Sequence, residues 1–294
     1  MNGIKKTGEI GRGLSFALIG AIYIVATVVG IVVYAFLPTT LIFPIRLLVA
    51  DVAATVATFI FSLIFKNASV YDPYWSVQPI VILLALAVTH GVTTYTLVLL
   101  LAVLFWGVRL TANWAYTFKG MAHEDWRYRM LKEKTGVFYP VINFVGIHMV
   151  PTLVVYGCTL PAAMAIIVGA DGEIFSYFAL LLSLCAAVMQ GIADIQMHRF
   201  RKRGEGGFIR EGLWKNSRHP NYLGEILMWW GIGISAVTAL DGGRYFLLAG
   251  AVANTLLFLF VSIPLADGRQ SRKSGFETYK KQTRMLLPFP KNNK

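Results

Sequence analysis

A dense polar segment with the sequence RHPNYLGE, residues 218–225, opens an apolar run at residues 226–240. Polar groups are costly where a chain enters a bilayer, which favours a role in holding a partner. Arg218, His219 and Asn221 offer donors for a phosphate or a ribose, and Glu225, one helical turn after Asn221, accepts from an amide or a hydroxyl. We interpret the segment as the mouth of a site for an anionic cofactor. For Arg218 and His219 the alternative is a positively charged flank of a membrane span.

A second polar set precedes this segment. One face of the expected helix carries Gln190, Asp194, Met197 and Arg201. The basic, glycine-rich loop at residues 202–207 follows, and backbone N–H groups together with Arg side chains suit phosphate. An ordinary helix-end ion pair of Asp194 with His198 or Arg201 is the alternative. Neither a GxGxxG after a strand nor a GxxxxGK[ST] occurs, so a Rossmann unit and a P-loop are excluded.

Arg269 and Arg272 lie about one turn beyond the last apolar run, on one helix face. They either close over a phosphate or face lipid head groups. Both possibilities place cationic side chains at the same end of the chain's apolar runs as the RHPNYLGE segment.

Three ionisable residues lie deep in the early apolar runs: Arg46, Asp51 and Arg109. Arg46 and Asp51 either pair on one helix, or Arg46 extends toward the membrane surface. Arg109, Asn113 and Tyr116 are spaced by four and then three residues, so they share one helix face. This face lines either a functional cavity or a structural polar network.

The sequence DPYWS at residues 72–76 begins the third apolar run. It is typical of a helix start, with Asp72 as the N-cap and Pro73 at the first helical position. The alternative is a carboxyl at the edge of a cavity, kept protonated by burial. Asp72 would then donate a hydrogen bond to a substrate carbonyl.

These residues need a scaffold, and the composition predicts one inside a membrane. The 294 residues are 56% hydrophobic and 14% charged, whereas soluble domains have about 25% charged residues. Apolar runs predict eight spans, or seven if a short run is merged or demoted. They lie at 14–37, 42–66, 76–91, 93–118, 138–169, 174–198, 223–240 and 244–266. Pro151 and Pro161 should kink or break the fifth span.

The distribution of charge predicts the orientation of these spans. The net charge is +12, and nearly all Lys and Arg fall before the first span or after the second, fourth, sixth and last spans. By the positive-inside rule both termini and the large loops are cytoplasmic, which accounts for the charge without a nucleic-acid partner. Cys158 and Cys185 lie in apolar runs without a CxxC or a ligand cluster, so no metal site is expected.

Together these observations predict an all-α, polytopic integral membrane bundle of seven to eight transmembrane helices, with cytoplasmic loops capping a cofactor cavity. We expect one domain over residues 1–294, with N-terminal helices to about residue 70 followed by the substrate and cofactor helices. We also expect a monomer.

Several segments resemble a known family. The stretch from Asp194 to Arg201, the sequence SRHPNYLGE and the closing FETYKKQTRMLLPF are similar to the C-terminal half of steroid 5α-reductases. With DPYWS included, the chain resembles bacterial steroid 5α-reductase-like membrane proteins over residues 70–290. The RH-x-x-Y pattern also occurs in sterol C14 reductases and in isoprenylcysteine carboxyl methyltransferases.

The resemblance implies an NADPH-dependent oxidoreductase that saturates the Δ4 double bond of a 3-oxo steroid, a 3-oxo-5α-steroid 4-dehydrogenase. Hydride goes to the enone β carbon while a protein acid polarises the ketone. Taken with the residues above, the expected cofactor set is Arg109, Gln190, Asp194, Arg201, Arg218, His219, Asn221, Tyr222, Glu225, Arg269 and Arg272.

The family's catalytic pair, a carboxyl and a tyrosine, matches Asp72 and Trp106 by order and spacing. Trp106 is a departure, because an indole N–H donates a hydrogen bond but is not an acid. Tyr74 and Tyr116 are the alternatives for the second member.

The expected partners are an apolar enone such as a steroid, and membrane lipid, in the inner membrane of a bacterium with the cofactor site on the cytoplasmic side. An S-adenosylmethionine-dependent membrane methyltransferase, a sterol C14-reductase-like enzyme and a transporter are the competing hypotheses. The many Arg residues favour a phosphorylated cofactor over S-adenosylmethionine. The polar clusters lie at the cytoplasmic ends rather than at the midplane, which disfavours a transporter.

Overall fold

The computed structural model describes residues 11–204, 206–240 and 243–291, so the expected cytoplasmic termini, residues 1–10 and 292–294, lie outside the described residues. Within these ranges the chain forms helices, with one isolated bridge between Ser217 and Arg284. The main helices are α1 (Arg12–Phe36), α2 (Phe43–Ile64), α3 (Tyr74–His90), α4 (Thr94–Thr117), α5 (Trp126–Thr135), α7 (Val150–Ile167), α8 (Ile174–Arg203), α9 (Pro220–Ala239), α10 (Ala249–Leu257), α11 (Ile263–Gln270) and α12 (Phe276–Gln282). The shorter helices are η1 (Ala68–Tyr71), η2 (Gly136–Phe138), α6 (Tyr139–Ile142), η3 (Asn143–Met149), η4 (Gly212–Lys215), η5 (Tyr245–Leu248) and η6 (Phe258–Ser262).

Seven helical stretches of the described chain are long and apolar enough to cross a membrane, which confirms the all-α polytopic prediction. They are Arg12–Phe36, Phe43–Ile64, Ala68–His90, Thr94–Thr117, Trp126–Ile167, Ile174–Arg203 and Tyr245–Gln270. The expected span at 223–240 forms α9 but is not among them, because Glu225 and several glycines lower its mean hydropathy. Most α9 side chains are buried by protein instead.

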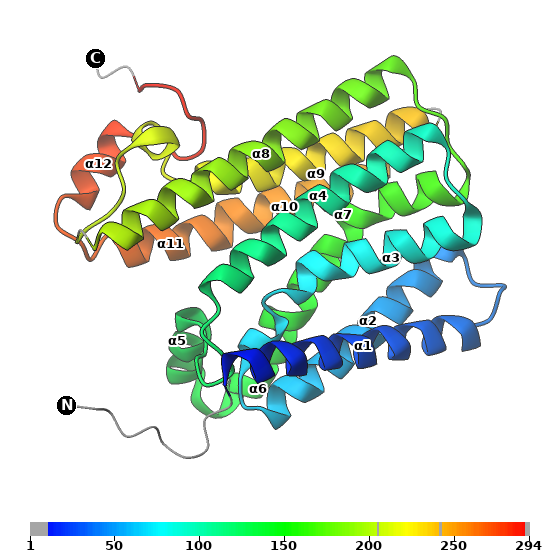
Figure 1. Cartoon of the computed structure of the whole chain (residues 1–294), viewed down its shortest axis with the longest axis horizontal. Coiled ribbons are helices and arrows are strands. Elements are labelled where there is room, and N and C mark those ends of the chain that lie inside the picture. The colour runs from blue at the N-terminus through cyan, green and yellow to red at the C-terminus, as the bar shows by residue number, and fades with distance from the viewer. Residues whose placement is uncertain (1–10, 205, 241–242, 292–294) are drawn as a thin grey trace. The chain divides into compact units, whose positions relative to one another are not determined.

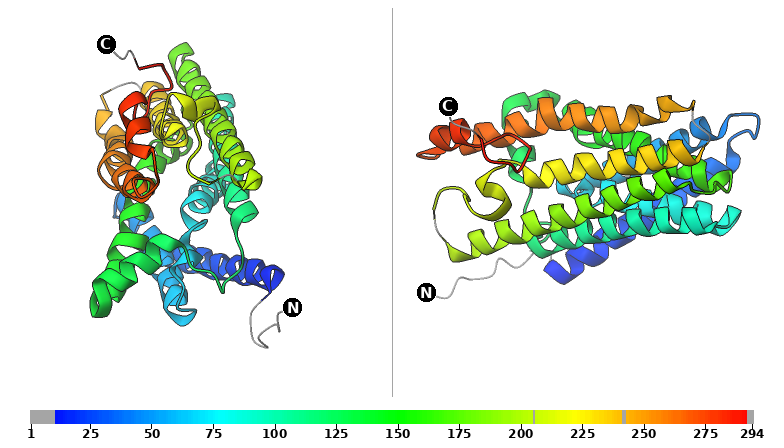
Figure 2. Two further views of the ribbon diagram at one scale, coloured as in Figure 1. Left: turned by 90° about the vertical axis from the view of Figure 1, so that its left-hand side faces the viewer. Right: turned by 90° about the horizontal axis from the view of Figure 1, so that it is seen from above.

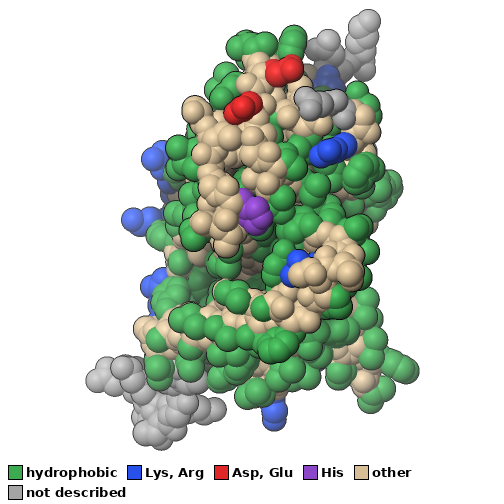
Figure 3. Space-filling model, turned by 90° about the vertical axis from the view of Figure 1, so that its right-hand side faces the viewer, with side chains coloured by type: hydrophobic (Ala, Val, Ile, Leu, Met, Phe, Trp, Pro, Cys, Tyr) green, Lys and Arg blue, Asp and Glu red, His purple; other side chains and the backbone are tan. Residues whose placement is uncertain are grey.

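The surface of the protein is apolar over large areas. Hydrophobic side chains dominate the face seen in Figure 3, and residues such as Phe36 and Val88 are almost fully exposed. Soluble proteins rarely expose contiguous apolar surface on this scale, whereas lipid covers such a surface without cost. The protein is therefore an integral membrane protein.

Two expected helix ends take a different form. Asp72 has helical backbone angles, φ −51° and ψ −46°, directly after η1. An N-cap residue is non-helical, so the interpretation of Asp72 as a helix cap is wrong. The fifth span is interrupted as expected, by the π-helix η3 just before Pro151. Proline lacks the N–H of a regular α-turn, which explains the wider turn there, whereas Pro161 lies inside a continuous α7.

The chain forms two compact units, and each consists of two stretches of sequence. Unit 1 comprises Met1–Val81 and Leu110–Tyr156, and unit 2 comprises Ile82–Arg109 and Gly157–Lys294. The single domain expected from the sequence stays a prediction.

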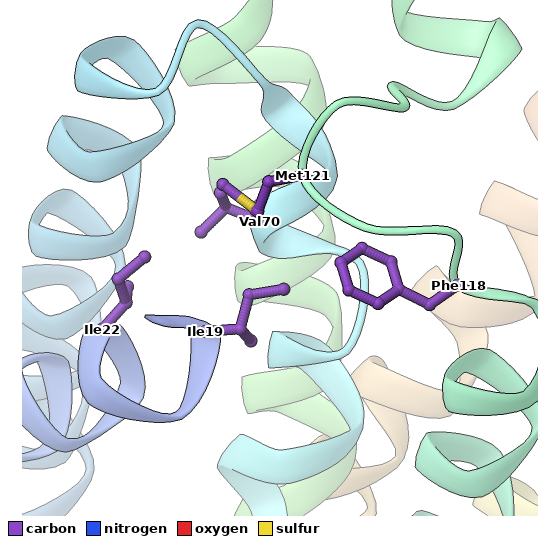
Figure 4. Close-up of a cluster of buried hydrophobic side chains, with 5 residues drawn as sticks. All are labelled: Ile19, Ile22, Val70, Phe118 and Met121. Atoms are coloured by element: carbon purple, nitrogen blue, oxygen red, sulfur yellow. The ribbon is translucent and has the colours of Figure 1, made fainter. Parts of the chain in front are cut away.

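In unit 1, α1 and α2 pack side by side (Figure 1). A Cβ on Gly30 would lie 3.3 Å from the carbonyl oxygen of Ala50, so glycine permits this close approach. Beside these helices a small hydrophobic core joins α1 to η1 and to the segment that follows α4 (Figure 4).

In unit 2, α8 and α9 lie alongside each other (Figures 1 and 2). A Cβ on Gly224 would lie 2.7 Å from the Cβ of Gln190 and 2.8 Å from the oxygen of Ala186. Gly231, seven residues further along, is equally close to α8. Small residues let membrane helices approach to backbone contact. This packing presses the polar face of α8 against the polar start of α9.

Candidate functional site

The centre of the candidate site in unit 2 is the carboxylate of Glu225, whose side chain is only 2% exposed. It accepts hydrogen bonds from Trp106 Nε1 at 2.8 Å, from Gln190 Nε2 at 2.8 Å and from Trp229 Nε1 at 2.9 Å. The donors come from α4, α8 and α9. Because all three partners donate, an ionised carboxylate satisfies the set, and it ties the three helices together.

Arg109 and Asp194 form the second part of the site. Arg109 Nη1 lies 2.9 Å from Asp194 Oδ2, and both side chains are largely buried. Asn221 Nδ2 donates to the other carboxyl oxygen of Asp194 at 3.4 Å. The partner of Asp194 is thus Arg109 on α4, and not only its neighbours on α8. The structure brings together five predicted cofactor residues: Arg109, Gln190, Asp194, Asn221 and Glu225.

Three polar atoms in this cluster are buried and have no hydrogen-bond partner among the described residues: Arg109 Nε, Arg109 Nη2 and Gln190 Oε1. Each such atom costs about 1–3 kcal/mol if it stays unsatisfied. Because Gln190 donates its N–H to Glu225, its oxygen points away from that carboxylate. A bound group that both donates and accepts would satisfy Gln190 and Arg109 together.

Arg218 and His219 have an internal partner, Asp267 of α11. Arg218 Nη2 lies 3.2 Å and His219 Nε2 2.9 Å from its two carboxyl oxygens. Arg218 also donates to the carbonyl oxygen of Thr283 at 2.9 Å, and its side chain is 9% exposed. Arg218 and His219, which the sequence suggested as phosphate ligands, therefore bind the C-terminal segment to the start of α9.

Tyr222 stacks on His219 with ring centroids 5.2 Å apart and 7° between the ring planes. Its other neighbour is Phe258 of η6, at 4.8 Å. The C-terminal segment is held further by Tyr279, whose hydroxyl donates to the carbonyl oxygen of Trp214. These contacts give the RHPNY part of the motif a role in joining α9 to the segment that follows α10.

Three cationic residues of unit 2 lie at and beyond the ends of α8 and α11. Arg201, Arg269 and Lys273 are exposed. Partial desolvation lowers the pKa of the Lys273 ammonium although the side chain is largely exposed, and repulsion from Arg269 and Arg201 lowers the pKa further. Lys273 Nζ also donates to the carbonyl oxygen of Gly207 at 2.6 Å. Three mutually repelling cations close together favour the binding of a polyanion. Arg272, the other predicted phosphate ligand of this segment, is exposed as well.

The loop between α8 and α9, in which residue 205 lies outside the described residues, folds back onto α8. Gln196 Oε1 accepts from the backbone N–H of Leu213 at 2.9 Å, and Trp214 Nε1 donates to the carbonyl oxygen of Ala193 at 3.0 Å. Ala193, Ile209 and Trp214 form a buried cluster. The glycine-rich segment is therefore anchored beside Lys273 and Arg201.

Three of the predicted catalytic residues, Asp72, Tyr74 and Tyr116, lie in unit 1. Asp72 Oδ1 accepts from the hydroxyl of Tyr128 at 2.6 Å and lies 3.6 Å from Arg127 Nη2. Tyr74 is buried and packs between the rings of other tyrosines. Tyr116 is 67% exposed. Trp106, the fourth, lies in unit 2 and donates to Glu225.

A second carboxyl of unit 1, Asp51, is 4% exposed, and the side-chain amide of Gln78 lies beside it without a hydrogen bond of regular geometry. Arg46 does not pair with it, since its guanidinium donates to the carbonyl oxygen of Tyr34 at 3.1 Å and lies over that ring. The Arg46–Asp51 pair considered from the sequence is therefore not formed.

Sequence reasoning missed Asp267, Trp229 and Lys273. Trp229 was open to prediction, because it lies one helical turn after Glu225 on the same face. Asp267 had no local signal, since the chain places it 48 residues from His219. No group of three or more His, Cys, Asp and Glu side chains that could hold a metal occurs in the part of the chain that the structure describes.

Comparison with known proteins places the chain in a family. Residues 58–283 match the model of DUF1295, described as a protein of unknown function. The chain belongs to this family. It is also 25% identical over 194 residues to Uncharacterized protein C594.04c of Schizosaccharomyces pombe, a match that covers 56% of each chain. The chain thus spans about half the length of that relative. No solved structure matches it.

Proposed function

We propose that this protein of the DUF1295 family is an NADPH-dependent reductase that saturates a carbon–carbon double bond conjugated to the ketone of an apolar lipid. By the resemblance noted from the sequence, a 3-oxo steroid with a Δ4 double bond is the proposed substrate. The observation that carries the proposal is the set of unsatisfied buried atoms on Arg109 and Gln190, together with the exposed cations Arg201, Arg269 and Lys273, of which Arg201 lies about three turns further along α8.

A nicotinamide carboxamide has the chemistry that the buried end of this site lacks. Its carbonyl oxygen would accept from Arg109 and its amide N–H would donate to Gln190 Oε1. Both protein groups are pre-positioned, because Arg109 is paired with Asp194 and the Gln190 amide is held by Glu225. A polar group that finds such preformed partners loses little freedom on binding.

The phosphates of the same cofactor would lie at the exposed end. A rise of about 1.5 Å per residue puts Arg201 roughly 16 Å along α8 from Gln190, a separation that an extended dinucleotide can span. Lys273 replaces Arg218 in the proposed phosphate set, because Arg218 is engaged by Asp267 and Thr283. Arg218 and His219 would act on the cofactor by fixing the start of α9.

Bound NADPH would supply the hydride, and the protein must supply an acid that polarises the ketone. Asp72 stays our first proposal for this acid, with Tyr74 or Tyr116 beside it. Asp72 Oδ1 is already engaged by the hydroxyl of Tyr128, with Arg127 Nη2 at 3.6 Å. Asp51 is therefore a second candidate, because its carboxyl is 4% exposed and makes no hydrogen bond of regular geometry in the described residues.

The proposed role of Trp106 changes with its contacts. Its N–H is occupied by the Glu225 carboxylate, so Trp106 would position Glu225 and Gln190 rather than touch a substrate ketone. We propose that the cofactor end faces the cytoplasm, because the Lys- and Arg-rich loops predicted to be cytoplasmic lie next to the cofactor residues in the sequence. In a bacterium this would be the inner side of the inner membrane.

S-adenosylmethionine is the competing ligand that the buried atoms also suit. Its carboxylate would accept from Arg109 and its ammonium would donate to Gln190 Oε1. It carries a sulfonium and no phosphate, however, so Arg201, Arg269 and Lys273 would repel it or contribute nothing. These three cations favour NADPH.

Ligand binding to the purified full-length protein tests the proposal. NADPH fluorescence titration should give saturable binding that weakens at least tenfold in Arg201→Gln. Lys134→Gln, which removes an exposed cation of α5 in unit 1, is the matched control and should bind as the unchanged protein does. Binding of S-adenosylmethionine but not of NADPH would overturn the proposal.

Turnover of NADPH with progesterone or a similar enone, followed by product mass, tests the reaction itself. The expected product carries two more hydrogens than the substrate. Asp72→Asn and Asp51→Asn should separate the two candidate acids, since only the acting acid loses turnover while NADPH affinity stays the same. Full turnover in both variants would remove a unit 1 carboxyl from the mechanism.

A further inference from the structure

A pocket of unit 1 has no part in the proposed reductase chemistry. It lies where α2 ends, has a volume of about 390 Å³, and is lined by residues that include Phe65, Lys66, Met121, His123, Glu124 and Arg129. The first two follow α2, and the others belong to the segment from the end of α4 into α5. The pocket thus combines an apolar floor with a mostly cationic rim.

The basic side chains of the rim are not engaged by other groups of the described protein. In the described residues the side chains of Lys66, His123 and Arg129 take part in no hydrogen bond or ion pair. Glu124 is the acid of the pocket, and its Oε1 already accepts from the backbone N–H of Ala68 at 3.1 Å. Lys66 and Arg129 against Glu124 leave an excess of one positive formal charge. The rim therefore favours an anion.

The backbone at Lys66 supports a role for its ammonium. Its φ is +51°, and among the described residues it is the non-glycine residue with positive φ. Glycine would make this turn without strain, so a lysine here is not explained by the turn. The conformation is imposed by Asn67, whose N–H donates to Ser62 O at 3.0 Å and whose Nδ2 donates to Met121 O at 2.7 Å. Strained residues held in this way occur at ligand clamps.

The floor of the pocket belongs to a packed core and lies at the expected level of a membrane surface. Met121 packs with Ile19, Ile22, Val70 and Phe118 in the core of Figure 4. Lys66 lies just beyond the membrane-capable helix Phe43–Ile64. The ends of transmembrane helices lie at the depth of phospholipid head groups, where phosphates are the abundant anions.

We propose that this pocket binds a phosphate group, with Lys66 and Arg129 as its charged ligands and His123 as a further donor. The phosphate belongs either to an anionic phospholipid or to a soluble phosphomonoester. Phe65 and Met121 would contact the glycerol end of either molecule.

The test uses the full-length protein in detergent and two probes. Native mass spectrometry follows retention of dioleoyl phosphatidylglycerol, and calorimetry follows binding of glycerol 3-phosphate. We expect one phosphatidylglycerol to be retained, with an affinity that falls at least tenfold in Lys66→Gln and in Arg129→Gln. Lys134→Gln, an exposed cation on the same helix as Arg129, should change it less than twofold.

The two probes identify the source of the phosphate. Retention of lipid that glycerol 3-phosphate does not displace assigns the pocket to a phospholipid; binding of glycerol 3-phosphate with the same dependence on Lys66 assigns it to a soluble phosphomonoester. Lys66→Gly tests whether lost binding merely reflects lost folding. Glycine adopts the positive φ of this position without strain, so this variant should have a higher unfolding temperature and still lose binding. Binding of neither probe, or equal effects of Lys66→Gln and Lys134→Gln, would overturn the proposal.

Discussion

Replacing Glu225 with Gln tests how the centre of the unit 2 site is built. The carboxylate accepts from Trp106, Gln190 and Trp229 at 2.8–2.9 Å. A Gln side chain of the same shape offers an oxygen in one position and an NH₂ group in the other. If the NH₂ faces Trp229, that indole N–H has no acceptor. If it faces the other two donors, the Gln190 amide can flip and accept, but the Trp106 N–H has none.

Either arrangement therefore leaves one buried indole N–H unpaired, since both Trp side chains are at most 1% exposed. An unsatisfied buried donor costs about 1–3 kcal/mol, and the bonds that remain lose their charge assistance. At about 2–4 °C per kcal/mol, the unfolding temperature of Glu225→Gln should fall by roughly 2–12 °C. The flipped Gln190 would also weaken NADPH binding.

A double-mutant cycle with Trp229→Phe separates this account from a general loss of packing. Phe removes the N–H that clashes with the introduced amide, and the cavity it leaves is common to both backgrounds. Trp229→Phe should therefore cost at least ~1 kcal/mol less in the Glu225→Gln background than with Glu225 present. Thermal unfolding in detergent measures all four proteins. Additive effects, or an unchanged unfolding temperature in Glu225→Gln, would refute the three-donor geometry.

Three further changes probe the surrounding scaffold by thermal unfolding. Asp267→Asn leaves the buried Arg218 charge without its partner and should cost about 3 kcal/mol. Gly224→Ala forces α8 and α9 apart and should cost about 1–3 kcal/mol. Burial raises the pKa of Tyr279 to about 12, from 10.0. The unfolded chain therefore loses this proton first, and stability should fall between pH 10 and pH 12, an alkaline loss that Tyr279→Phe should make smaller.

The helical faces of the site were predictable from local spacing. Gln190 and Asp194 recur at one turn along α8, as Asn221 and Glu225 do along α9, and the structure joins the two faces. That step follows from the sequence because a polar stripe on an otherwise apolar helix must find polar partners inside the protein. The positions of the spans follow from the apolar runs in the same way.

Ion pairs between distant segments of the chain could not be predicted from local residue spacing. Arg109 meets Asp194 across 85 residues of sequence, and Arg218 meets Asp267 across 49. Several acids were equally plausible partners for each Arg, and only the packing of the helices selects one. The strained backbone of Lys66 was also invisible, because a lysine near a membrane surface is expected on charge alone.

The contacts divide the predicted cofactor residues by what they can still bind. Arg218, His219 and Glu225 of the motif satisfy most of their hydrogen-bonding capacity within the protein, and of Arg218 only Nε is buried without a partner in the described residues. Arg109 and Gln190 lie outside the motif and together keep three buried atoms without partners among those residues. A ligand gains most where it replaces a missing bond, because the desolvation cost there is already met.

Substitutions in the motif and substitutions at the unsatisfied pair should therefore differ in kind. Changing Arg218 or Glu225 should lower NADPH affinity and the unfolding temperature together, since the loss passes through the scaffold. Arg109→Lys keeps a cation opposite Asp194 but removes the fork of N–H donors, so it should lower affinity with a smaller effect on stability. If Arg109→Lys and Glu225→Gln lowered affinity and stability in the same proportion, the unsatisfied atoms would not mark the contact with the ligand.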